Sequence, residues 1–264
     1  MTEITAFDGV KLFFEVLGEG EIPLLFICGW GTPTGIKNWQ PELQLSEKYK
    51  LILIDLPGHG KSGRNREICS MQSYGEDVKS VVEYLDLHNV ILIGHSMGAA
   101  VMLEAETLIS DRILGLIAVD SLFPTIGSIY RKLEGPYMEK FVQPFRDNFE
   151  PAYEYFVSSF LPENFDKSLV QWIFDAIPTL DQRSLVSAWI ELCKWDVLDI
   201  LPKVQKPIKC IVAGRTIKNY SKEEYDRVFD SVIYLDGLGH LIMIEDAARL
   251  NNALEEAIQK LLNT

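Results

Sequence analysis

Residues 90–98 read Val-Ile-Leu-Ile-Gly-His-Ser-Met-Gly, and this stretch decides the fold expected of the chain. Its four leading apolar residues predict a strand buried on both faces, and the small residues after it predict the start of a helix. The chain must therefore turn sharply at Ser96. Gly94 and Gly98 flank the turn because a side chain at either position would collide with the neighbouring strand or helix. We expect the turn to place the Ser96 hydroxyl beside backbone N–H groups at a helix N-terminus.

The composition is that of an ordinary globular protein with an excess of acidic residues. The chain has 264 residues, 47% hydrophobic and 24% charged, enough for one domain with an insertion or for two small domains. The net charge of -13 argues against a nucleic-acid or anionic-membrane partner, because both need clustered Lys and Arg. The residues after Met1 have no basic stretch followed by an apolar core, so we expect no signal peptide. No apolar run approaches the roughly 18 residues of a membrane helix. We expect a cytoplasmic monomer or homodimer without membrane contact.

The cysteines predict neither disulfides nor a metal site. They are scattered along the chain, which is typical of buried free thiols in a reducing compartment, and no Cys/His spacing suggests zinc. The four cysteines are Cys28, Cys69, Cys193 and Cys210.

Strand and helix signals alternate along most of the chain. Short apolar runs without alternation indicate strands covered by helices on both faces, as in a parallel sheet. A hairpin of Ile4–Phe7 and Val10–Leu17 is expected at the start. Further strands are expected at Leu24–Cys28, Leu51–Ile54, Val90–Ile93, Ile113–Val119, Ile208–Ala213 and Val232–Leu235. Helices are expected at Tyr74–Leu87, Met97–Ile109, Lys222–Phe229 and Ala247–Leu262.

The pattern changes in residues 124–200, where aromatic-rich amphipathic stretches replace the strand signals. These stretches are Ala152–Phe160, Ser168–Ala176 and Gln182–Trp195. They predict a helical cap inserted over the carboxyl edge of the sheet. The expected division is a core of residues 1–123 and 201–264 with a cap of residues 124–200.

Together these features resemble the α/β-hydrolase superfamily over essentially the whole chain. The segment around Ser96 resembles its nucleophile elbow, and Asp55–Ser62 resembles its D-x-P-G-x-G-x-S turn. The end of that turn also mimics a phosphate-binding loop, but the first glycine of such a loop would have to stand where Asp55 stands. The resemblance implies a doubly wound, mostly parallel sheet with an inserted helical cap and a serine-hydrolase activity that needs no metal or cofactor.

A serine nucleophile needs a positioned base, usually a histidine. His88 precedes the strand that leads to Ser96 and so lies at its far end, and the His95 side chain points away from its neighbour Ser96. His59 lies at the correct edge of the sheet, but within the structural turn. His240 follows the last strand, where the superfamily places its histidine loop, and we expect it to be the general base.

The position of the acid that would orient His240 differs from that in most superfamily members. They place an Asp shortly after the strand equivalent to Ile208–Ala213, whereas residues 214–220 of this chain contain no acid. The other position known in the superfamily is the end of the preceding strand, which carries Asp120. The order Ser96, Asp120, His240 keeps the nucleophile–acid–base order, so we expect Asp120 to orient His240.

Three alternatives to this assignment stay open. Asp120 could only cap the turn into the cap region. Asp236 is close to His240 in sequence but too local to orient it well. Asn219 could hold a neutral imidazole more weakly.

The resemblance also implies an oxyanion hole of two backbone N–H groups. One belongs to Met97, the residue after the nucleophile. The other belongs to Trp30, in the loop Gly29-Trp30-Gly31-Thr32 that follows a predicted strand. Cys28 replaces the usual His before this loop. The alternative is a plain glycine-rich turn with Trp30 in the core.

Substrate contacts are expected from Trp30 and Phe123. Aromatic residues of the cap either line an acyl pocket or, as is more common at helical spacing, form the core of the cap. They are Tyr137, Phe141, Phe156, Trp172, Trp189 and Trp195. Arg215 is a candidate clamp for a phosphate or carboxylate.

The resulting hypothesis is a serine hydrolase that cleaves a small, largely apolar ester or related acyl substrate through an acyl-enzyme. The same catalytic residues also suit a carbon–carbon bond hydrolase, a lyase or a cofactor-free haloperoxidase. A ligand-binding receptor or pseudoenzyme is the alternative from a different class, because the usual acid position is empty.

Overall fold

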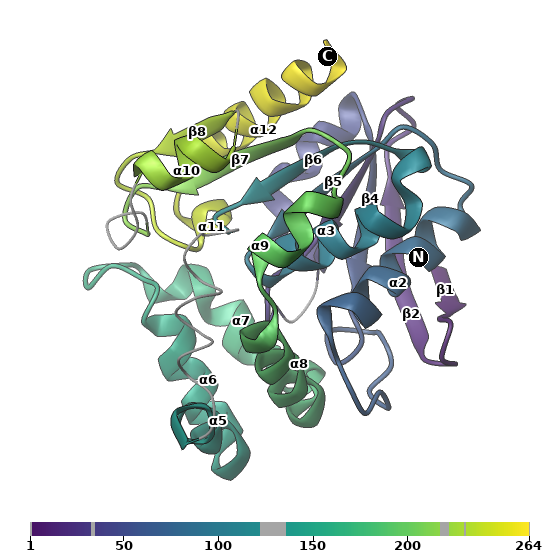
Figure 1. The fold of residues 1–264 in the computed structure, drawn as a ribbon. Coiled ribbons are helices and arrows are strands. Elements are labelled where there is room, and N and C mark those ends of the chain that lie inside the picture. Colours follow the sequence, from purple (N-terminus) through teal and green to yellow (C-terminus); the bar gives the residue numbers. More distant parts are fainter. Residues whose placement is uncertain (1, 33–34, 122–135, 217–221, 230, 264) are drawn as a thin grey trace.

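An eight-stranded sheet forms the centre of the protein, with strand order β1-β2-β4-β3-β5-β6-β7-β8 (Figure 1). The computed structural model describes residues 2–32, 35–121, 136–216, 222–229 and 231–263. The pairs β1–β2 and β2–β4 are antiparallel, and all the other pairs are parallel. The predicted mostly parallel sheet is therefore confirmed. Its strands are β1 (Thr2–Thr5), β2 (Lys11–Leu17), β3 (Pro23–Ile27), β4 (Lys50–Asp55), β5 (Val90–His95), β6 (Ile113–Val119), β7 (Ile208–Ala213) and β8 (Val232–Leu235).

Burial along the strands follows their place in the sheet. Every residue of β3 and β5 is buried, because these central strands are covered on both faces. In β1, by contrast, burial alternates between intermediate and exposed residues, as expected for an edge strand with one solvated face. The uninterrupted apolar runs therefore mark the centre of the sheet.

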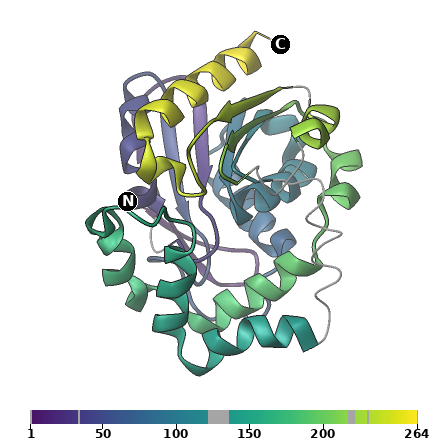
Figure 2. The same ribbon diagram turned by 90° about the vertical axis from the view of Figure 1, so that its left-hand side faces the viewer.

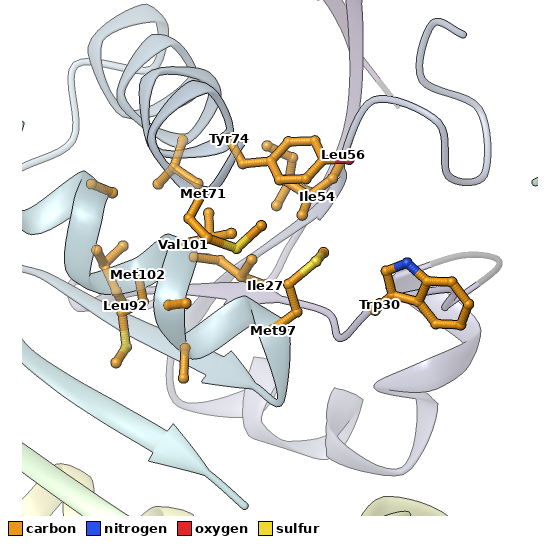
Figure 3. Packing of buried hydrophobic residues seen from close by; sticks show 14 of the residues in the cluster. Ile27, Trp30, Ile54, Leu56, Met71, Tyr74, Leu92, Met97, Val101 and Met102 are labelled. Atoms are coloured by element: carbon orange, nitrogen blue, oxygen red, sulfur yellow. The ribbon is translucent and has the colours of Figure 1, made fainter. Parts of the chain in front are cut away.

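Helices cover both faces of the sheet. One core cluster joins one sheet face to α2 (Met71–Tyr84) and α3 (Met97–Ile109). The second cluster joins the opposite face to α12 (Ala247–Leu262). In Figure 3, Met71 of α2 and Val101 of α3 lie close together above the sheet. The doubly wound arrangement follows directly, since the apolar stripe of each helix faces one side of the sheet.

A capping box sets the start of α2 three residues before the predicted position. The Ser70 side chain accepts a hydrogen bond from the Ser73 backbone N–H, and the Ser73 side chain accepts one from the Ser70 N–H. Two backbone N–H groups that have no acceptor within the helix thereby gain one. The helices α3 and α12 begin and end where the sequence predicted.

The described part of the segment between β6 and β7, from residue 136 on, is mainly helical, as predicted. In Figures 1 and 2 its helices α5–α8 are grouped on the side of the molecule away from α12. Sequence periodicity missed the first of these helices, and the limits 124–200 of the cap stay a prediction. The helices here are α5 (Pro136–Asp147), α6 (Phe149–Ser158), α7 (Gln171–Asp175), α8 (Gln182–Lys194) and α9 (Val197–Ile200).

The remaining helices are short. They are α1 (Gly35–Asn38), α10 (Lys222–Val228) and α11 (Ile242–Glu245). None of the helices in the described ranges has the length and apolar character needed to span a bilayer. All four cysteines are buried and free, as predicted.

Candidate active site

Ser96 occupies a strained turn between β5 and α3. Its backbone has φ 53° and ψ -123°, a left-handed conformation that costs energy in a residue with a side chain. A Cβ on Gly98 would lie 2.3 Å from the Ile27 carbonyl oxygen, and one on Gly94 would lie 2.5 Å from the Gly98 carbonyl oxygen. The two flanking glycines are therefore required by close backbone approach, as the sequence indicated.

Two hydrogen bonds hold the Ser96 backbone in this turn. Its N–H donates to the Val119 carbonyl oxygen at 3.1 Å. The Ser121 hydroxyl donates to its carbonyl oxygen at 2.6 Å. Both partners lie at the end of β6, so this neighbouring strand supports the turn.

His240 and Asp120 form a direct pair at the carboxyl edge of the sheet. The distance from His240 Nδ1 to Asp120 Oδ2 is 2.7 Å, and the Asp120 side chain is fully buried. An ionised carboxylate only accepts hydrogen bonds, so Nδ1 carries the proton and Nε2 is left as the basic nitrogen. The structure thus brings together the two residues that the sequence predicted as acid and base.

The carboxylate of Asp120 has two further donors. Its Oδ1 accepts a hydrogen bond from the Ala213 N–H at 2.8 Å, and its Oδ2 accepts one from the Thr216 hydroxyl at 2.9 Å. Both donors belong to the end of β7 and the residues after it. Sequence reasoning searched this segment for an acid and missed the donors that it supplies instead.

His95 lies beside His240, with ring centroids 4.7 Å apart. Its Nε2 donates to the His240 carbonyl oxygen at 2.9 Å. Complete burial, with a smaller contribution from the nearby His240, lowers the pKa of His95 to about 3, so its ring stays neutral. The sequence excluded His95 as the base but did not show that it contacts the histidine loop.

The loop after β3 approaches Ser96 closely. A Cβ on Gly29 would lie 3.0 Å from Ser96 Cβ, so a larger residue there would fit only if Ser96 shifted by a few tenths of an ångström. Gly31 has φ +71°, its N–H donates to His59 Nε2 at 3.1 Å, and its carbonyl oxygen accepts from the Tyr153 hydroxyl at 2.5 Å. This loop is therefore clamped between the core and the cap.

His59 has the structural role that the sequence indicated. Its Nδ1 donates to the Pro57 carbonyl oxygen at 3.2 Å, which leaves Nε2 to accept from Gly31. Burial lowers the pKa of His59 to about 4, so the ring stays neutral and keeps this tautomer.

Trp30 joins the loop to the cap. Its Nε1–H donates to the Leu185 carbonyl oxygen at 2.7 Å. Its ring packs against Phe145, Tyr153, Phe156 and Trp189, with centroids 5.1 to 6.2 Å apart. Figure 3 shows the indole on the loop, set apart from Met97 at the start of α3. The ring contacts of Trp30 thus connect the cap to the loop that borders Ser96.

A cavity of about 530 Å³ contains Ser96 and His240 in its lining. Trp30, predicted to contact substrate, also lines it, as does Met97. Four of the predicted cap aromatics line the same cavity: Phe156, Trp172, Trp189 and Trp195. Phe141 stacks on Trp189 with centroids 4.7 Å apart and belongs to the core of the cap. The Tyr137 side chain, Phe123 and Asn219 lie outside the described residues.

This fold, with its strained serine and its histidine–aspartate pair, is that of an α/β-hydrolase. The model of the alpha/beta hydrolase family matches residues 24–253, and the chain belongs to that family.

The comparisons with individual proteins agree with the family but span a range of activities. The AB hydrolase superfamily protein YisY of Bacillus subtilis is 23% identical over 94% of this chain and 96% of its own length. The bifunctional esterase/perhydrolase DCH of Acinetobacter calcoaceticus is 33% identical, over 37% of this chain and 36% of its own length. The first matches among curated relatives thus span only about a third of those proteins.

Solved structures match the fold over its whole length. An esterase from Exiguobacterium antarcticum superposes with a TM-score of 0.83 at 19% identity, over 98% of this chain and 99% of its own. A bromoperoxidase from Bacillus anthracis superposes with a TM-score of 0.84 at 20% identity, over 100% of both chains. At such identities the likeness defines the fold and not the substrate.

Proposed function

We propose that this protein is a serine hydrolase that cleaves a largely apolar ester or related acyl compound through an acyl-enzyme. Ser96 is the nucleophile, His240 the general base, and Asp120 the acid that orients His240. The observation that carries the proposal is the 2.7 Å contact between His240 Nδ1 and Asp120 Oδ2, with His240 and Ser96 lining one cavity. A carboxylate in this position fixes the imidazole tautomer and stabilises the imidazolium that forms during catalysis.

In the proposed first half-reaction, His240 Nε2 takes the proton from the Ser96 hydroxyl. The serine oxygen attacks the acyl carbon and forms a tetrahedral oxyanion. Collapse of this intermediate breaks the ester bond, and the imidazolium of His240 gives its proton to the leaving alcohol. An acyl group then remains on Ser96.

In the second half-reaction, His240 takes a proton from a water molecule that attacks the acyl-enzyme. A second tetrahedral intermediate collapses, the serine oxygen recovers the proton from His240, and the carboxylic acid leaves. This sequence uses only groups of the chain, water and the substrate.

The oxyanion is proposed to be bound by the backbone N–H groups of Met97 and Trp30. The first follows Ser96 at the N-terminus of α3, where N–H groups have no partner within the helix. The second is supported by the close approach of Gly29 to Ser96 Cβ and by the hydrogen bonds that clamp Gly31. Removing one such donor typically costs about 10²- to 10³-fold in kcat.

A perhydrolase activity is a second candidate. It is favoured by the similarity to the esterase/perhydrolase of Acinetobacter calcoaceticus and to a non-heme haloperoxidase of Rhodococcus erythropolis, 34% identical over 37% of this chain. Halide oxidation that depends on acetate, hydrogen peroxide and Ser96 would support this candidate.

A fluorophosphonate probe tests the proposed function. The wild type should be labelled, and labelling should be lost in both Ser96→Ala and His240→Ala, because the probe reacts only with an activated serine. A folded wild type that remains unlabelled would overturn the proposal and favour a binding protein on the same fold.

A further inference from the structure

The only Asp, Glu, Lys or Arg in the described lining of the cavity is Arg215, and its guanidinium is already engaged. Its Nη1 lies 2.8 Å from Glu245 Oε2 and donates to the Gly237 carbonyl oxygen at 3.1 Å. Its Nη2 donates to Glu245 Oε1 at 2.9 Å and to the Phe160 carbonyl oxygen at 3.4 Å. The guanidinium therefore donates three hydrogen bonds within the protein and makes one further ion-pair contact with Glu245.

The Arg215–Glu245 pair packs against Gly239, the residue before His240. A Cβ on Gly239 would lie 2.1 Å from Arg215 Nη2 and 2.9 Å from Glu245 Oε1, so the pair occupies space that only glycine leaves open. The Gly239 N–H also donates to Glu245 Oε2 at 3.2 Å. The two opposite charges therefore offset each other at the cavity wall.

The rest of the described lining contains no Asp, Glu, Lys or Arg. His95 is kept neutral by burial, as shown above, and the polar residues are uncharged, including Thr32, Ser159 and Thr216. The apolar lining includes aromatic rings of the cap, among them Phe156, Trp172 and Trp189, whose large faces suit apolar groups. Against the described lining, a ligand carboxylate would lose its hydration without gaining an unpaired Lys or Arg, which is unfavourable.

The cavity is also larger than a short acyl group needs. Its volume of about 530 Å³ lies within the roughly 300 to 1,000 Å³ of typical ligand pockets. Acetyl would leave most of this space unfilled.

We propose that the substrate carries an uncharged, bulky apolar acyl group, either aryl or medium-chain alkyl, and that the Arg215–Glu245 pair makes the site discriminate against substrates with a second carboxylate. This inference rests on the proposed serine-hydrolase function. In this inference Arg215 does not bind an anion. Glu245 neutralises its charge, and its N–H groups donate to the carbonyl oxygens of Gly237 and Phe160.

A matched pair of esters tests the proposal. p-Nitrophenyl octanoate and the mono-p-nitrophenyl ester of octanedioic acid have the same chain length and differ by a terminal carboxylate. The wild type should hydrolyse the neutral ester with a kcat/KM at least about 100-fold higher, because an unpaired buried charge costs several kcal/mol. Among neutral esters of graded length, octanoate should exceed acetate.

Glu245→Gln should lower the ratio of kcat/KM for the neutral ester to kcat/KM for the carboxylate ester by roughly tenfold, because the positive charge of Arg215 is then no longer neutralised. The matched control is Glu255→Gln, which changes the net charge equally. Glu255 lies on α12, pairs with Lys48 and is not part of the cavity lining, so the preference should not change. The ratio of two substrates within one variant is independent of the folded fraction.

The inference would be overturned if the wild type hydrolysed the two matched esters with similar kcat/KM. It would also be overturned if Glu245→Gln and Glu255→Gln changed the ratio of the two kcat/KM values equally, or if acetate were preferred to octanoate. If the wild type turned over neither ester, quenching of tryptophan fluorescence in Ser96→Ala would measure binding of the two esters directly. Preferential binding of the neutral ester would then support the inference while the proposed function failed. Equal binding of the two esters would overturn both the inference and the proposed function.

Discussion

The hydroxyl of Thr216 donates a hydrogen bond of 2.9 Å to Oδ2 of Asp120. The same oxygen accepts the hydrogen bond from His240 Nδ1. The segment after β7 contains no acid, so its contribution to the site is a donor that holds the carboxylate supplied by β6. This relationship makes Thr216 a positioning residue for the histidine–aspartate pair.

Thr216→Val should lower kcat/KM for an activated ester about tenfold with little change in KM. One hydrogen bond to a charged group is worth roughly 1.5 to 3 kcal/mol, and Asp120 keeps its bond to the Ala213 N–H. Thr216→Ser should retain near wild-type activity. Steady-state kinetics over a range of pH checks both.

The control for this prediction is Thr107→Val. The Thr107 hydroxyl donates to the Glu104 carbonyl oxygen within α3 and lies outside the cavity lining. Equal losses in Thr216→Val and Thr107→Val would show that the effect is only structural.

Asp120→Asn should lower kcat by roughly 10⁴-fold, as expected when the group that orients the base is neutralised and the imidazole tautomer is no longer fixed. Asp236→Asn is the comparison variant, because Asp236 precedes the same histidine loop. It should turn over the ester almost as the wild type does. The opposite result, with Asp236→Asn inactive and Asp120→Asn active, would assign the acid role to Asp236.

Stability should fall as the pH is lowered from about 6.5 to about 4, with a contribution from His59. The pKa of His59 is lowered to about 4 by burial, whereas an unfolded histidine has a pKa of about 6.5. Between these values the unfolded chain binds the extra proton, so the stabilisation present above pH 6.5 is lost on acidification. One such group contributes up to about 1.4 kcal/mol per pH unit.

Urea unfolding of His59→Gln at pH 7.5, 5.5 and 4.5 checks this contribution. The variant should be less stable at pH 7.5 but should lose stability less steeply than the wild type on acidification. His88→Gln removes an exposed histidine and should keep the wild-type slope. A slope for His59→Gln identical to that of the wild type would contradict the prediction.

Arg66→Leu should destabilise the protein by about 3 to 5 kcal/mol. The Arg66 guanidinium contacts Asp77 and Asp8, and its side chain and that of Asp77 are almost completely buried. Removing one partner leaves a buried charge uncompensated.

The comparison for Arg66→Leu is Lys11→Met, which breaks the exposed pair of Lys11 with Glu3 and should change stability by less than about 1 kcal/mol. Chemical denaturation at neutral pH measures both. A loss below 1 kcal/mol for Arg66→Leu would show that the buried pair is not needed for stability.

Much of the core follows from local rules. The apolar runs predicted the strands, and β6, β7 and β8 have the predicted bounds. In β6 the run is uninterrupted because the strand is buried along nearly its whole length. The start of α2 was placed wrongly because Ser70 and Ser73 act as a capping box, which the apolar spacing does not reveal. The helix α5 was missed although its apolar residues recur at helical spacing; Pro144 lies inside it, and a proline usually ends or kinks a helix.

The sequence by itself determined the turn at Ser96 and the roles expected of its neighbours. Gly94, Ser96 and Gly98 lie within five residues, so the close approach of strand and helix is encoded locally. His240 was found by elimination among four histidines and by its place after the last strand.

Only the tertiary structure decided which acid holds His240 and how the pocket is charged. Asp120 is separated from His240 by 120 residues, and Arg215 from Glu245 by 30. Hydrogen bonds and ion pairs of this kind depend on distances of a few ångströms, which strand order and loop packing set and local sequence does not. The strained turn at Ser96 can therefore be predicted from the sequence. The pairing of Asp120 with His240 and of Arg215 with Glu245 is decided only by the folded structure.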